Sequence, residues 1–206
     1  MDPDSVNIRK RQIDTRVSDI QFILDQLEKI QSGALRHPLN GYLDLSRIGV
    51  TGHSFGGSTA ALIAKKDRRV KDVSLIDVWL NPLTENVIRN GIDQPFLYMG
   101  RPSWIDSDYP SSPTISEIMH KNNPGPSYYV TVKNTRHLNF CDAPLFSPIG
   151  KYLIEIGDID RKRSVELVNQ LSLEFFDQYL REKRSTILNG AETVSEFIIS
   201  NNLKHN

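Results

Sequence analysis

Residues 47–57, RIGVTGHSFGG, predict a strand, a sharp turn and a helix, with Ser54 at the apex of the turn. A turn this tight brings backbone segments so close together that side chains beside the serine would clash. We expect Gly52 and Gly56 to meet that need. The helix that follows, over residues 57–66, holds small residues and ends in two lysines, which favour a helix carboxyl end. Ser54 is therefore the leading candidate for a catalytic nucleophile, and the alternative is a serine that only caps a helix.

The composition indicates an ordinary globular protein. The chain has 206 residues, enough for one domain with its own core, and we treat residues 1–206 as a single domain. It carries 25 acidic and 25 basic residues, a balance that argues against a nucleic-acid partner held by a general positive field. The single cysteine, Cys141, excludes an intrachain disulfide.

The amino terminus is charged and holds no apolar stretch like that of a signal peptide. No other span is long and apolar enough to cross a bilayer, and no segment is distinctive as a membrane anchor. These features favour a cytoplasmic location, with at most peripheral contact with a lipid surface. Secretion stays open if further polypeptide precedes this amino terminus.

A regular apolar pattern runs through the first part of the chain. Apolar residues recur at steps of three and four from Ile13 to Ile30, which predicts a helix that Gly33 can end. We expect this helix to pack on a sheet. After the strand that leads to Ser54, we expect these elements in order: strands at 70–76, 95–99 and 128–132, and an amphipathic helix at 165–179. Strands that alternate with helices indicate an α/β fold with a mostly parallel sheet.

A serine hydroxyl is a poor nucleophile unless a base lies within hydrogen-bond reach and a carboxylate orients that base. On a parallel sheet, such groups collect at the carboxyl ends of the strands. Asp77 directly follows the strand at 70–76, and His137 follows the strand at 128–132 after a short turn. The order Ser54, Asp77, His137 is that of an α/β-hydrolase triad. We expect Ser54 to be the nucleophile, His137 the general acid and base, and Asp77 the group that orients the imidazole.

The other candidates for these roles are weaker. Four further histidines are expected to be structural or exposed: His37, His53, His120 and His205. Strand alternation points His53 away from Ser54, and His120 is expected on a helix surface. Asp142 lies near His137 in sequence, but the irregular chain between them does not place it behind the imidazole. No metal-ligand spacing and no phosphate loop are visible, so we expect neither a metal nor a cofactor.

The remaining site predictions concern the oxyanion and the substrate. The backbone N–H of Phe55, the residue after the nucleophile, is expected to be one oxyanion donor. The second donor normally comes from a loop after an early strand, and only a helix precedes the nucleophile strand here. Trp79, Trp104 and Phe140 are expected to bind substrate, with core packing as the alternative for each.

These residues resemble one family, the platelet-activating factor acetylhydrolases of the α/β-hydrolase fold, in the plasma and intracellular type II branch. The similar segments are GHSFGG at 52–57, IDVWLNP at 76–82, HLNF at 137–140 and GDID at 157–160. They occur in order and span nearly the whole chain. The resemblance implies a calcium-independent serine esterase that removes short or oxidised acyl chains from the second position of glycerophospholipids, with Ser54, Asp77 and His137 as its triad.

The chain departs from this family at its front. Members carry several strands before the nucleophile strand, so the resemblance implies the carboxyl-terminal part of the fold, with the first strands supplied by a longer chain. Two alternatives stay open: a broad-specificity carboxylesterase or lipase-like hydrolase, and a catalytically silent fragment that acts as an interaction module.

Overall fold

A five-stranded sheet forms the centre of the computed structural model, which describes residues 3–105, 107, 109–147, 149 and 154–203. The strands, in their order across the sheet, are β1 (Ile48–His53), β2 (Val70–Ile76), β3 (Phe96–Gly100), β4 (Ser127–Val132) and β5 (Phe197–Asn202). The helices are α1 (Pro3–Gln31), α2 (Phe55–Lys66), α3 (Glu85–Asn90), α4 (Ser112–Asn122), the 3₁₀ helix η1 (His137–Phe140), α5 (Ala143–Phe146) and α6 (Arg161–Leu180). No helix in the described ranges is both long enough and apolar enough to cross a bilayer.

The first four strands run parallel, as the alternation of strands and helices predicts. β5 pairs antiparallel with β4 at the edge of the sheet. It was not predicted from the sequence, because its three apolar residues are followed by three polar ones and give no strand-length alternation. The predicted α/β class, a mostly parallel sheet flanked by helices, is confirmed.

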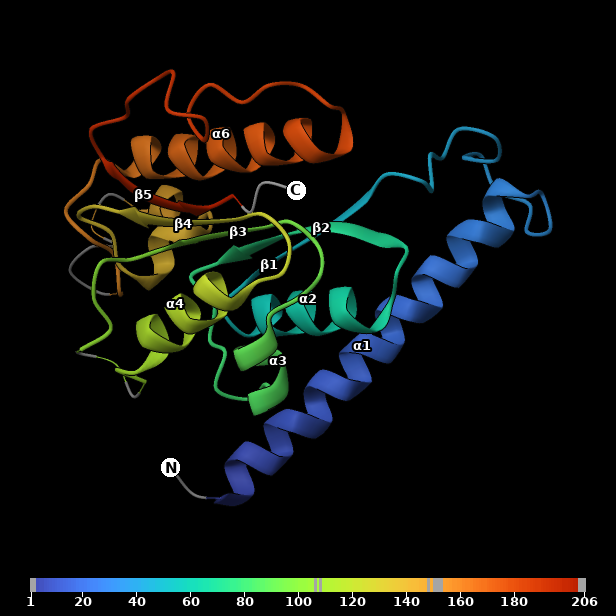
Figure 1. Ribbon diagram of the computed structural model, residues 1–206, viewed down its shortest axis with the longest axis horizontal. Coiled ribbons are helices and arrows are strands. Elements are labelled where there is room, and N and C mark those ends of the chain that lie inside the picture. The colour runs from blue at the N-terminus through green and yellow to red at the C-terminus, as the bar shows by residue number, and fades with distance from the viewer. Residues whose placement is uncertain (1–2, 106, 108, 148, 150–153, 204–206) are drawn as a thin grey trace.

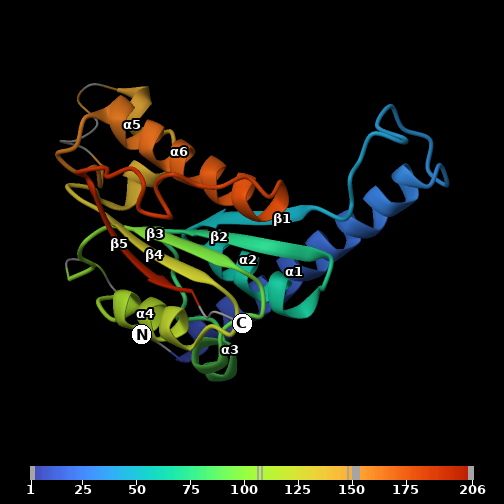
Figure 2. The same cartoon turned by 45° about the horizontal axis from the view of Figure 1, so that its top comes forward.

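Helices cover both faces of the sheet, as Figure 2 shows. On one face α6 packs against β1, β2 and β3, and on the other α2 packs against β1 and β2. Strand alternation divides the core accordingly. Leu75 and Tyr98 are paired in register and face the core of α1 to α4, whereas Leu97 and Met99 face the core of α6. The sheet is therefore held from both sides, which fixes the carboxyl ends of its strands.

The long helix α1 runs along α2 and extends beyond the edge of the sheet (Figure 1). Its buried residues include Ile13, Val17 and Leu24, and Gly33 follows it with a φ of 80°, as a helix-ending glycine does. The helix and its end were predicted correctly. The expectation that this helix packs on a sheet is corrected, because its main contacts are with α2.

β1 forms the other edge of the sheet, and a cavity lies on each side of it. One, of about 460 Å³, is lined by Ile20 of α1, Val50 of β1 and Ala60 of α2. The other, of about 340 Å³, lies between β1 and α6 and is lined by Phe176. Exposed Thr51 lines both cavities. The edge of β1 is thus open between two hollows that belong to opposite faces of the sheet.

Asp72 is a buried carboxylate on β2, opposite Gly49 of β1. A Cβ atom on Gly49 would lie 2.5 Å from Oδ1 of Asp72, so the glycine makes room for the carboxyl group. Among the described residues, neither oxygen of Asp72 has a hydrogen-bond partner. Burial raises the pKa of Asp72 to about 7, because desolvation disfavours the charged form.

We expect Asp72→Asn to flatten the pH dependence of stability. The pKa of Asp72 in the folded protein lies above its unfolded value near 4, so the free energy of unfolding falls as the pH rises from about 4 to about 7. The variant has no such proton to release. Between pH 5 and pH 8 its melting temperature should therefore drop less than that of the wild type, with a difference between the two drops on the order of 5 °C. The matched control is Asp93→Asn at an exposed site. An unchanged drop in Asp72→Asn would contradict this assignment.

Candidate active site

Ser54 lies at the turn between β1 and α2 with φ 56° and ψ −122°, a conformation that residues other than glycine rarely adopt. Two backbone hydrogen bonds hold it there. The N–H of Ser54 donates to the carbonyl oxygen of Ile76 at 2.9 Å, and the N–H of Trp79 donates to the carbonyl oxygen of Ser54 at 3.2 Å. The segment after β2 therefore fixes the strained turn that β1 and α2 share.

Two glycines allow the close approach at this turn. A Cβ atom on Gly52 would lie 2.3 Å from the backbone of Gly56, and one on Gly57 would lie 2.5 Å from Cγ2 of Val78. A Cβ atom on Gly56 would meet nothing within 4 Å. The prediction was therefore correct for Gly52 and wrong for Gly56, because the second close contact falls one residue later, where α2 packs against the segment after β2.

The three residues predicted as a triad meet at the carboxyl ends of their strands. Nε2 of His137 lies 3.0 Å from Oγ of Ser54, and Nδ1 of His137 lies 2.6 Å from Oδ2 of Asp77. Asp77 is fully buried, whereas the His137 side chain is 20% exposed. With Nδ1–H donated to the carboxylate, Nε2 is left to accept the proton of the serine hydroxyl.

Asp77 is itself held in place by β3. It has a positive φ of 38°, and its N–H donates to the carbonyl oxygen of Met99 at 2.7 Å. Its Oδ1 accepts the backbone N–H of Arg101 at 3.0 Å. Both carboxylate oxygens therefore have donors, and the Oδ2 that faces His137 cannot swing away without loss of these bonds.

A cavity of about 340 Å³ opens in front of Ser54 and His137. Trp79, Trp104 and Tyr109 line it, as do the charged groups of Arg101 and Glu155. Trp104 is only 4% exposed and presents its ring edge-on to His137 at a centroid distance of 5.9 Å. The structure therefore places Trp79 and Trp104 at the site, as predicted from the sequence. The contributions of Tyr109, Arg101 and Glu155 were missed, because no local pattern marks them.

Phe140 does not join this cavity. Its ring is buried in the core beneath α6 together with Leu167 and Leu171, and it lines the hollow beside β1 instead. The expectation that Phe140 binds substrate is corrected to core packing, the alternative that was left open. The short helix η1 begins at His137, which faces Ser54, and by its last residue the side chain of Phe140 points into the core instead.

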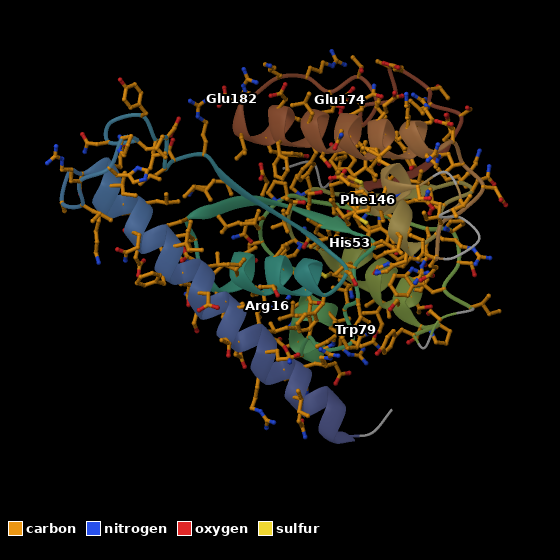
Figure 3. The ribbon with its side chains drawn as sticks, turned by 180° about the vertical axis from the view of Figure 1, so that it is seen from behind. Arg16, His53, Trp79, Phe146, Glu174 and Glu182 are labelled. Carbon is orange, nitrogen blue, oxygen red and sulfur yellow. The ribbon has the colours of Figure 1, made fainter. Side chains whose placement is uncertain are left out.

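His53 makes a contact that alternation did not predict. Its ring lies against that of His137, with centroids 4.5 Å apart, and its Nε2–H donates to the carbonyl oxygen of His137 at 3.2 Å. Burial, and next the charge of His137, lower the pKa of His53, which favours the neutral form. In Figure 3, His53 and Trp79 lie on the same side of the molecule, away from the carboxyl end of α1.

His53, Asp77 and His137 also form a group whose ligand atoms all lie within 4.8 Å of one another. In the described part of the chain this is the group with a spacing that suits a metal ion. Three of its four ring nitrogens have hydrogen-bond partners: Nε2 of His53 binds the His137 carbonyl oxygen, and the two nitrogens of His137 bind Asp77 and Ser54. The hydrogen bonds of His137 to Ser54 and Asp77 suit proton transfer from the serine.

The other candidates from the sequence lie elsewhere. His120 was expected on a helix surface, but it is buried. Its Nδ1 lies within hydrogen-bond distance, 2.9 Å, of the Ser127 hydroxyl oxygen, and that hydroxyl donates to the His120 carbonyl oxygen at 3.0 Å. His37 is exposed, and Asp142 lies at the amino end of α5. His205 lies outside the described residues.

Phe55 is the first residue of α2, where a helix offers no acceptor for the backbone N–H. Its N–H is therefore available to an oxyanion at Ser54. Its side chain packs against Trp79 at a centroid distance of 5.8 Å, and the guanidinium of Arg16 from α1 lies 4.7 Å from its ring. Figure 3 shows Arg16 between α1 and α2.

The strained serine turn, the histidine and the acid at the ends of parallel strands define an α/β-hydrolase fold. A solved structure with the same fold is "Ferulic acid esterase from Streptomyces cinnamoneus at 2.4 A resolution", with a TM-score of 0.73 and 24% identity over 93% of this chain and 55% of that one. Residues 2–193 match the family "Platelet-activating factor acetylhydrolase, isoform II". The chain belongs to this family, as its sequence motifs indicated.

Curated relatives agree with this membership. The platelet-activating factor acetylhydrolase of Gallus gallus is 27% identical over 191 residues, which cover 86% of this chain and 44% of the relative. That of Cavia porcellus is 30% identical over 186 residues, 84% of this chain and 41% of the relative. A "Probable 1-alkyl-2-acetylglycerophosphocholine esterase" of Arthroderma benhamiae is 28% identical over 189 residues, which cover 86% of this chain and 46% of the relative. The chain thus spans less than half the length of these relatives.

We expect Gly57→Ala and Gly56→Ala to differ sharply in stability. The added methyl at position 57 would meet Val78 at 2.5 Å and the Gly52 carbonyl oxygen at 2.9 Å, so we expect a loss of about 2 kcal/mol. Gly56→Ala has open space and should change the free energy of unfolding by less than about 0.5 kcal/mol. Urea unfolding of both variants measures the difference, and equal losses would contradict the packing described for the turn.

Proposed function

We propose that this chain carries the catalytic centre of a serine ester hydrolase of the platelet-activating factor acetylhydrolase type. The observation that supports this most directly is the hydrogen-bonded series Ser54, His137, Asp77, with separations of 3.0 and 2.6 Å, on a strained turn. Such a series activates a hydroxyl that is otherwise a poor nucleophile.

In the proposed reaction, Oγ of Ser54 attacks the ester carbonyl carbon while its proton passes to Nε2 of His137. Asp77 stabilises the imidazolium that forms. The N–H of Phe55 donates to the developing oxyanion. The tetrahedral intermediate collapses when His137 protonates the leaving alcohol, which leaves an acyl-serine. A water molecule, deprotonated by His137, then attacks the acyl carbon. The bond from that carbon to Oγ of Ser54 breaks as His137 returns the proton to Oγ, which releases the acid and restores the serine.

The substrate class we propose is an ester with a short acyl chain on a glycerophospholipid. The cavity in front of Ser54 has about 340 Å³, near the lower end for ligand pockets, and its lining mixes aromatic rings with charged groups. A short acyl group suits this space better than a long alkyl chain. The names of the relatives point to the same class, an acetyl ester of a glycerophosphocholine.

We expect kcat/KM for a 2-acetyl phosphatidylcholine analogue to exceed that for its 2-palmitoyl counterpart by at least about tenfold. The methylene groups of the long chain find no pocket, so they contribute no binding energy in the transition state. Release of the free acid from monomeric substrates measures both rates, and Ser54→Ala provides the background. Rapid hydrolysis of nitrophenyl acetate with no activity on either phospholipid would instead favour the broad-specificity carboxylesterase.

We also propose that another stretch of polypeptide pairs with β1 in the complete enzyme. An open edge in a parallel sheet is normally covered, and side chains of an added strand would alternate between the two hollows that meet at Thr51. Because the relatives are more than twice as long as the matched region, they contain further chain from which such a strand can come. The same addition offers a place for the second oxyanion donor.

Amide hydrogen exchange tests the proposed strand pairing. We expect β1 amides to exchange at least about tenfold more slowly when this chain is expressed together with the preceding region of a full-length relative, because new backbone hydrogen bonds protect them. The edge strand β5 serves as the internal control and should not change. Equal exchange of β1 in both samples would count against pairing at this edge.

A further inference from the structure

Two exposed arginines of α1 reach the residue that follows the proposed nucleophile. Cζ of Arg16 lies 4.7 Å from the centre of the Phe55 ring, and Cζ of Arg9 lies 5.7 Å from it. The two arginines are two helical turns apart, so they share one face of α1. Phe55 in turn packs against Trp79, which lines the cavity in front of Ser54. A positively charged cluster therefore lies beside the proposed active site, on the side of α1.

The charge of this cluster is not neutralised within the described ranges. Asp19 lines the same hollow as Arg16 but forms no ion pair with it. Nη1 of Arg9 donates to the side-chain oxygen of Gln12 at 2.9 Å, and this amide is neutral. The first turn of α2 holds no acidic residue that would offset the positive end of its dipole. An anion bound here would therefore meet uncompensated positive charge.

The hollow of about 460 Å³ beside β1 gives an anion room next to these charges. Arg16 and Gly56 line it, and a Cβ atom on Gly56 would meet nothing within 4 Å. Ile20 and Ala60 also line it, each about one helical turn further along α1 or α2. The charged end of the hollow thus lies toward Ser54. A side chain of the proposed added strand can fill the apolar end without displacing the anion.

Arg101, on the other side of Ser54, is already neutralised. Among the described residues that line the cavity there, it is the permanent cation. Its Nε lies 3.4 Å from Oδ2 of Asp77, and its Nη1 pairs with Glu155. Its guanidinium also lies 3.9 Å from the centre of the Trp104 ring. A negatively charged substrate group is therefore attracted to α1 rather than into this cavity.

We propose that Arg9 and Arg16 bind the phosphodiester of the substrate and so determine a preference for phospholipids over neutral esters. The inference rests on the proposed function, in which the ester carbonyl lies at Ser54 with its oxygen at the N–H of Phe55. The acyl group then enters the cavity in front of Ser54, and the phosphate lies across the Phe55 ring. Guanidinium groups suit this role because their planar fork matches two phosphate oxygens.

The dimensions of a glycerophospholipid fit this placement. In a 2-acyl ester the carbonyl carbon and the phosphorus are about 6 Å apart when extended, and a guanidinium carbon lies about 4 Å from the phosphorus that it binds. Cζ of Arg16 lies within about 10 Å of the Phe55 nitrogen, because the centre of a phenyl ring is no more than about 5 Å from its own backbone nitrogen. One bound ester can therefore reach both the oxyanion donor and Arg16.

The experiment is a calorimetric titration of the 206-residue chain with a monomeric 2-acetyl phosphatidylcholine analogue, with Ser54→Ala as the parent to prevent turnover. In Arg16→Gln we expect the dissociation constant to rise by about fivefold or more, as for the loss of one exposed charged contact. In Arg9→Gln we expect a smaller rise, because its guanidinium lies further from Phe55. Arg16→Lys keeps the charge but loses the fork, so its value should fall between those of Arg16→Gln and the parent.

Two controls separate a phosphate contact from a general effect. A soluble neutral 2-acetyl glyceride should bind the parent and both glutamine variants with dissociation constants within about twofold, because it has no phosphate to lose a charged partner. Arg11→Gln removes a charge from another exposed position of α1 and should leave both ligands unaffected. Equal losses for both ligands, or no loss in Arg16→Gln, would overturn the proposal. A parent that does not bind the phospholipid would overturn it as well.

Inorganic phosphate and glycerophosphocholine distinguish a substrate site from a site for free phosphate. Glycerophosphocholine lacks the acyl ester, so it should bind more weakly than the phospholipid and still lose affinity in Arg16→Gln. Inorganic phosphate that binds as tightly as the phospholipid would overturn the role in substrate recognition.

These titrations do not depend on hydrolysis, so their failure and that of the proposed function can be told apart. The rate at which a fluorophosphonate modifies Ser54 in the wild-type chain reports an activated serine. A loss confined to the phospholipid in Arg16→Gln, with a wild-type chain that does not react, would overturn the proposed hydrolase and leave the anion site in place. A reactive chain without that loss would do the reverse.

Discussion

The hydrogen bond between Asp77 and His137 is the interaction on which the site depends. It joins the end of β2 to the turn after β4, two positions separated by 60 residues, and it does so from a carboxylate that is fully buried. Burial of a carboxylate costs free energy that hydrogen-bond donors offset. The N–H of Arg101 and Nδ1 of His137 supply those donors, and the N–H of Asp77 is itself bound to Met99. The acid is thus built into the sheet.

The parallel sheet explains why the remaining groups arrive at the same place. Parallel strands bring all their carboxyl ends to one edge, so residues that follow β1, β2 and β3 directly, and β4 after a short turn, meet there. Ser54 reaches this edge through a strained turn that Gly52 and Gly57 allow. The strain is held by backbone bonds to Ile76 and Trp79, which belong to the segment that also presents Asp77. Nucleophile and acid are therefore positioned by one shared piece of backbone.

Local sequence signals predicted a large part of this arrangement. The elbow, the parallel strands and the residues at their carboxyl ends depend on short-range patterns, so the sequence predicts Ser54, Asp77 and His137 as the site. Contacts between distant residues have no such pattern. The stacking of His53 on His137, the Arg101 to Glu155 pair and the burial of His120 arise from tertiary packing. Phe140 shows the same limit, because one turn of η1 decides whether its ring faces the cavity or the core.

The most direct test of the account is covalent modification of the intact chain by a fluorophosphonate, followed by peptide mapping. The structure predicts one adduct, on Ser54, with a rate that falls by at least about a thousandfold in His137→Ala, because the serine then lacks its base. His37→Ala, at an exposed site, should react like the wild type. A folded chain that forms no adduct on Ser54, or one that reacts equally well without His137, would contradict the claim that these residues form a working catalytic centre.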